Sequence, residues 1–110
     1  VYTLQEIYNM QQVKLISADE KLVVALFGEI DSATSEDFYA EVTAMYQNDK
    51  KDIVFDCAAL EFIDSTTLGT FVKIFKNVKA DGNRLILSNV RPRIRKLFEI
   101  CALDRIMEFE

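Results

Sequence analysis

The 110-residue sequence contains no histidine and only three glycines, one proline and two cysteines. Histidine is the commonest general base near neutral pH and a frequent zinc ligand, so its absence argues against hydrolases and metalloenzymes. The glycines at 28, 69 and 82 form no phosphate-binding loop, and no GxSxG or Walker pattern is present. We therefore expect no intrinsic enzymatic activity, no metal, no cofactor and no obligatory small-molecule ligand.

Paired cysteines and long apolar segments are lacking as well. Cys57 and Cys101 do not have the CxxC spacing of redox or zinc sites, and we expect both to be buried as reduced thiols. The longest apolar run, Leu22 to Phe27, is too short to cross a bilayer, and no segment has the pattern of a signal peptide. These features predict a cytoplasmic protein without a membrane span.

The formal net charge is −5, and no continuous basic face is present, which disfavours direct binding of nucleic acid. Apolar residues make up 50% of the chain, enough for one compact domain. Because Met10 precedes the first strand-like pattern, we expect residues 10–110 to form this domain. Residues 1–9 are then a leading extension or a remnant of the expression vector.

The apolar pattern predicts strands and helices in a regular order. Strands are indicated at 13–15, 22–27, 53–57 and 84–88, whereas 106–109 is too short to assign. Helices are indicated from about Ser35 to Asn48, with Ser32 and Thr34 as further candidate caps, from Ser65 to a stop at Asp81, and from Pro92 through Cys101. This order is typical of an α/β fold with right-handed crossovers. We expect a small mixed sheet of about four or five strands, with helices mainly on one face.

The most informative stretch is LEFIDSTTLGTFVKIF at 60–75, where an apolar strand leads through a hydroxyl-rich turn into an amphipathic helix. Asp64 suits the N-cap, and Ser65 begins the first turn, where backbone N–H groups lack partners within the helix. Burial of the apolar face leaves this tip accessible, and its partial positive charge tolerates a phosphate. The residues expected on the buried face are Leu68, Phe71, Val72, Phe75 and Val78.

These segments together resemble the STAS domain, specifically the bacterial anti-sigma factor antagonists. The resemblance covers about residues 11–109. It rests on GEID at 28–31, the strand at 53–57, FIDSTTLGTFV at 62–72 and RLILSNV at 84–90. It implies a regulator of transcription and signal transduction whose partner is an anti-sigma factor that is itself a serine kinase. The unphosphorylated form binds this partner and frees the sigma factor.

The resemblance also implies the site residues. The serine after the turn aspartate is the family's phosphorylation site, which by position is Ser65, with Thr66 as a second candidate. Asp31, Asp64, Ser65, Thr66 and Thr67 are expected to contact the partner. Family members commonly read DSSGLG or DSAGLG here, whereas this chain has Thr67 in place of glycine. We expect this threonine to add bulk beside the acceptor without breaking the helix.

Several alternatives stay open on the sequence alone. The hydroxyls at 65–67 suit ordinary helix capping, and Asp31 suits a cap of the first helix, from about Ser35 to Asn48. The same domain also serves as a scaffold subunit of stress-signalling or lipid-transport complexes, in which Ser65 need not be modified. The basic residues Arg91, Arg93, Arg95 and Lys96 indicate either a solvated helix face or an electrostatic guide toward an acidic partner or membrane phosphates.

Asp56 offers an alternative of another class, because an aspartate at the end of a buried parallel strand is the phosphoacceptor of receiver domains. Receivers also need an acidic pair after the first strand and a lysine after a later one, to hold Mg²⁺ and the acyl phosphate. At these two places the chain has GEID and SNVR. This difference favours a hydrogen-bonded carboxylate at Asp56.

Overall fold

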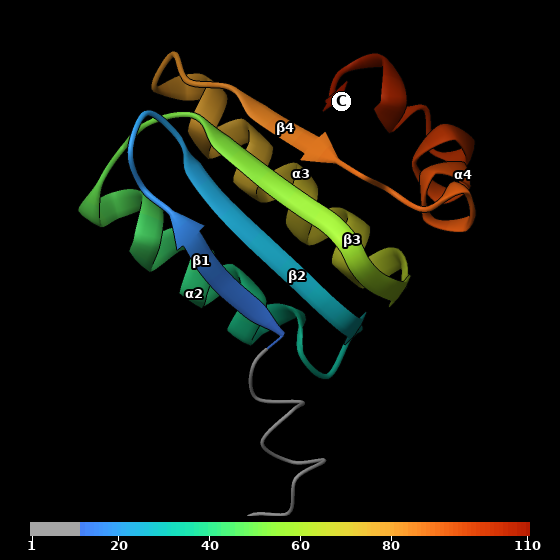
Figure 1. Ribbon diagram of the computed structural model, residues 1–110. Helices are drawn as coiled ribbons and strands as arrows, with labels where there is room; N and C mark the ends of the chain where they lie inside the picture. The colour runs from blue at the N-terminus through green and yellow to red at the C-terminus, as the bar shows by residue number, and fades with distance from the viewer. Residues whose placement is uncertain (1–11) are drawn as a thin grey trace, which may run out of the picture.

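The computed structural model describes residues 12–110, which form one mixed five-stranded sheet with helices (Figure 1). The strand order is β1-β2-β3-β4-β5; β1 and β2 are antiparallel, and the other pairs are parallel. The elements are β1 (Val13–Ser17), β2 (Leu22–Ile30), α2 (Ser35–Asn48), β3 (Ile53–Ile63), α3 (Ser65–Ala80), β4 (Leu85–Ser88), α4 (Pro92–Ile100), the 3-10 helix η1 (Leu103–Arg105) and β5 (Glu108–Phe109). The predicted α/β class is confirmed. The expected extension at 1–9 lies outside the described residues.

The core lies between one face of the sheet and helices α2 and α3, which Figure 1 shows together behind the sheet. At its centre Phe71 of α3 meets Phe38, Phe55 and Phe98, with ring centroids 5.2, 5.5 and 5.5 Å away. All four rings are buried, and their tilted or edge-on contacts are favourable for aromatic pairs. Phe71 therefore joins α3 to α2, β3 and α4 at once.

The buried face of α3 agrees with the sequence in part. Leu68, Phe71 and Val78 are buried as predicted, whereas Val72 and Phe75 are only partly buried against the core. Ile74, which the predicted stripe did not include, completes the buried face. The helix is thus rotated slightly relative to the expected stripe.

β3 is longer than the predicted strand at 53–57 and reaches Ile63. Two register shifts against β2 interrupt its alternation, and the second lies at Gly28, a buried residue with a φ of 64° that glycine adopts without strain. Of β3, only the first part, Ile53–Asp56, pairs with β4. The second half of β3 therefore extends past β4, toward the start of α3 and beside α4 (Figure 1).

The two cysteines differ in environment. Cys57 is buried as predicted, and burial raises the pKa of its thiol to about 12. The expectation for Cys101 was wrong, because α4 ends at Ile100 and the thiol lies exposed at the C-cap. Within residues 12–110, no helix is long and apolar enough to cross a membrane.

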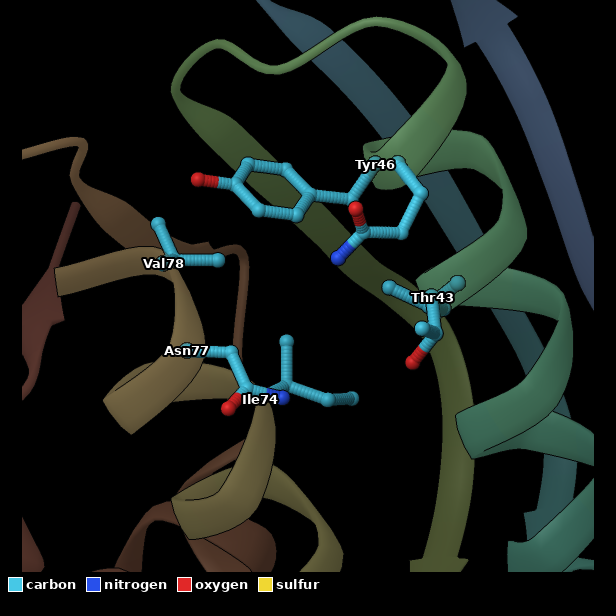
Figure 2. Close-up of a pocket in the computed structure, with 7 residues that line it drawn as sticks. Thr43, Tyr46, Ile74, Asn77 and Val78 are labelled. Carbon is cyan, nitrogen blue, oxygen red and sulfur yellow. The ribbon is translucent and has the colours of Figure 1, made fainter. Parts of the chain in front are cut away.

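A small groove separates the outer sides of α2 and α3 (Figure 2). It offers about 10 Å³, the space of roughly one water molecule. Beside it the Tyr46 hydroxyl donates to Asp81 Oδ2 at 2.8 Å and accepts from Asn83 Nδ2 at 2.9 Å, which ties α2 to the end of α3. Figure 2 labels five of the lining residues: Thr43, Tyr46, Ile74, Asn77 and Val78.

Replacing Phe71 by alanine should destabilise the domain by about 3–5 kcal/mol, because it leaves a cavity among three other rings. Urea unfolding followed by circular dichroism measures the loss. Phe75→Ala is the matched control: its ring is only partly buried, so the loss should be clearly smaller. Equal losses in the two variants would show that Phe71 is not the centre of the core.

Candidate functional site

The accessible tip of α3 is fixed by Asp64. This residue has an extended backbone (φ −118°, ψ −174°) and occupies the N-cap, where its Oδ1 accepts the Thr67 backbone N–H at 3.0 Å. The predicted cap is confirmed. Ser65 and Thr66 follow as the first two helical residues, and both are exposed. Two hydroxyls thus stand at the partially positive end of a rigidly packed helix.

The second carboxylate oxygen of Asp64 binds another element. The Ser32 backbone N–H, in the turn between β2 and α2, donates to Oδ2 at 2.8 Å. Hydrogen bonds from the Thr67 backbone foremost, and also from Ser32, hold the pKa of Asp64 below its ordinary value of 3.8. The ionised carboxylate therefore joins the β2–α2 turn to the start of α3. This link could not be predicted from the sequence, because its donor is a backbone group that any residue could supply.

Thr67 lies inside the protein. Its side chain is fully buried, and its hydroxyl donates to the Ile30 carbonyl oxygen at 2.6 Å, with Asp64 Oδ1 at 3.0 Å. The expected bulk beside Ser65 is thus absent, because the side chain points away from the surface toward the end of β2. Thr67 supports the site from within and has no surface of its own for a partner to touch.

Asp31 fixes the turn that faces the tip of α3. Its Oδ1 accepts the Ala33 backbone N–H at 2.9 Å and lies 3.3 Å from Thr34 Oγ1, while its carbonyl accepts the Ser35 N–H at 2.8 Å. Asp31 therefore orders the turn before α2, but the N-cap of this helix is Thr34, and no side chain caps it. Because Ile30 pairs in register with Ile63, the fold also brings Asp31 and Asp64 to the same end of the sheet.

Asp56 does not lie at a strand end, since β3 continues to Ile63. Its Oδ1 accepts the Ala58 backbone N–H and the Asn89 side-chain amide, both at 3.1 Å. These contacts agree with the hydrogen-bonded carboxylate that the sequence favoured over a receiver-like acceptor.

The basic residues of α4 have different surroundings. Arg91 donates two hydrogen bonds to the Ala58 carbonyl, at 3.2 and 3.1 Å, and Arg95 pairs with Glu99 at 3.4 Å. Arg93 and Lys96 are exposed, and neither side chain forms a hydrogen bond or ion pair within residues 12–110. Glu61, Arg91, Pro92 and Arg93 line a recess of about 400 Å³ between β3 and α4.

The STAS domain family model matches residues 8–110. The anti-sigma F factor antagonist of Lysinibacillus sphaericus is 32% identical over 85 residues, which are 76% of this chain and 73% of the relative. The anti-sigma-B factor antagonist of Staphylococcus aureus is 30% identical over 95 residues, which are 86% of this chain and 88% of the relative.

Solved structures of the anti-sigma factor antagonist SpoIIAA share the fold. Its unphosphorylated form matches with a TM-score of 0.64 and 30% identity, covering 86% of this chain and 96% of SpoIIAA. The phosphorylated Bacillus form matches with a TM-score of 0.67 and 30% identity, covering 90% of this chain and 89% of SpoIIAA. With its sequence, fold and turn motif in agreement, the chain belongs to the STAS domain family, within the group of bacterial anti-sigma factor antagonists.

Proposed function

We propose that this protein antagonises an anti-sigma factor that is also a serine kinase, binding it through the tip of α3 until phosphorylation of Ser65 releases the complex. The observation that carries the proposal is the exposed Ser65 hydroxyl, which directly follows an N-cap held by two backbone hydrogen bonds. The names of the relatives support this class of partner. The two solved forms of SpoIIAA support a phosphorylation switch.

The site suits a switch that acts on the interface and leaves the fold intact. A phosphate adds about −1.5 to −2 charges, and the first turn of α3 accepts it because that turn contains no acidic residue. A partner carboxylate about 4 Å away would be opposed by about 4 kcal/mol at an effective dielectric of about 20. Half of that reduces affinity more than tenfold.

We assign the partner contacts to Asp31, Asp64, Ser65 and Thr66, which the fold gathers at one end of the sheet. Thr67 is buried and positions the others. We expect a cytoplasmic binding module without catalysis of its own. The relatives' names favour this function over a transport or signalling scaffold.

Ser65→Ala should fold normally, since an exposed hydroxyl contributes only a fraction of a kcal/mol, and should stay bound to the kinase in the presence of ATP. Affinity capture from the native host with Ser65→Ala and Ser65→Glu baits identifies the kinase as the protein that only the first retains. The purified kinase should then phosphorylate wild type at Ser65, as read by mass spectrometry. Phosphate on Thr66 instead, or unchanged capture by Ser65→Glu, would refute the assignment.

Asp64→Asn should keep the bond to the Thr67 N–H but lose the one to Ser32, because the asparagine amide is itself a donor. We expect the free energy of unfolding to fall by about 1 kcal/mol at neutral pH and phosphorylation to be slower. The folded pKa of Asp64 lies below the unfolded one, so its stabilisation is present above the unfolded pKa and is lost as pH falls through the folded pKa. The difference in unfolding free energy between the two proteins should therefore shrink from pH 7 to about pH 3. Urea titrations across this range measure it, and a constant difference would mean that ionisation of Asp64 does not stabilise the fold.

A further inference from the structure

Phe62 is an exposed aromatic residue beside the switch. Five large apolar side chains of residues 12–110 are exposed, and Phe62, at 46%, is the one aromatic among them. Leu15 and Ile16 lie on the edge strand β1, and Ile100 and Ile106 lie near the chain's end. Phe62 alone stands two residues before the N-cap aspartate of α3.

The register of β3 explains why Phe62 is exposed. Ile63 pairs with Ile30, and both are buried toward the helices. Phe62 pairs with Glu29, so the two side chains point to the opposite face of the sheet, which no helix of residues 12–110 covers (Figure 1). This end of β3 also extends past β4. Neither packing in the core nor strand pairing therefore requires an aromatic side chain here.

A basic side chain shares a recess with Glu61, the residue before Phe62. Glu61, the neighbour of Phe62, shares the 400 Å³ recess with Arg93, whose guanidinium has no ion-pair partner within residues 12–110. The protein as a whole carries a net charge of −5, so this unpaired arginine stands against the overall sign. Aromatic residues and arginine are the residue types that protein interfaces favour.

We propose that the partner which meets Ser65 extends onto Phe62 and Arg93, placing an apolar side chain on the ring and a carboxylate on the guanidinium. The inference rests on the proposed function, because the occupant is the same anti-sigma factor. Two observations support this occupant: Phe62 lies two residues before the N-cap of α3, and Arg93 carries a charge that suits an acidic side chain of the partner. Phe62 supplies affinity, Arg93 guides the encounter, and Ser65 decides whether the complex persists.

The test measures the Kd of the purified anti-sigma factor kinase for the unphosphorylated full chain without ATP. Phe62→Ala should weaken binding at least about tenfold, mainly by faster dissociation, and Phe62→Leu should be intermediate. Ile16→Ala, which truncates an exposed apolar residue on the edge strand β1, should bind as wild type does. Circular dichroism at the same temperature establishes that each variant is folded.

Arg93→Glu should also weaken binding, and its difference from wild type should shrink between about 50 and 500 mM salt. Lys76→Glu, with the same charge change on the exposed side of α3, serves as the control and should have little effect.

If Ser65→Glu abolishes binding while Phe62→Ala and Arg93→Glu bind like wild type, this inference is wrong and the switch stands. If the kinase binds neither wild type nor Ser65→Ala, the proposed function is wrong and the inference falls with it.

Discussion

The arrangement of the site depends on one carboxylate that serves two chain segments. Because parallel strands end at the same edge of a sheet, the turns that follow β2 and β3 lie side by side. Each turn has backbone N–H groups that need hydrogen-bond acceptors. Asp64 supplies one oxygen to the start of α3 and the other to the turn before α2. The buried Thr67 hydroxyl also joins α3 to β2, because it donates a hydrogen bond to the Ile30 carbonyl. These bonds hold the two turns together beyond the last pair of the strands, Ile30 and Ile63.

This anchoring explains how a surface hydroxyl can be both accessible and well placed. The apolar side of α3 is held by Phe71 among three other rings, while its first turn extends beyond the core. The core packing therefore holds the helix in place, so the proposed partner would meet a preformed surface. Under the proposed function, little reorganisation would be needed for binding, so a change in charge at Ser65 would act directly on the affinity.

The sequence predicted those features of the fold that depend on residues close together in the chain. These features are the order of elements, the Asp64 cap and the burial of Leu68 and Phe71. They were predicted correctly because capping and apolar periodicity depend on neighbours in sequence. The full length of β3 could not be predicted from the sequence, because its register shifts are set by pairing with β2. The link from Asp64 to Ser32 joins residues far apart in sequence, and the burial of Thr67 depends on where β2 ends. Cys101 was misjudged because the apolar stripe outlasts the helix by one residue.

The contrast between the two cysteines has a practical consequence. Cys57 is buried, and at neutral pH its raised pKa leaves almost no thiolate, the form that reacts with electrophiles. Cys101 is exposed at the end of α4. A thiol-directed fluorophore should thus attach to the native chain at a single position without mutagenesis. Because α4 begins at the recess and Cys101 lies at its other end, such a label would report binding of the proposed partner while leaving the tip of α3 unaltered.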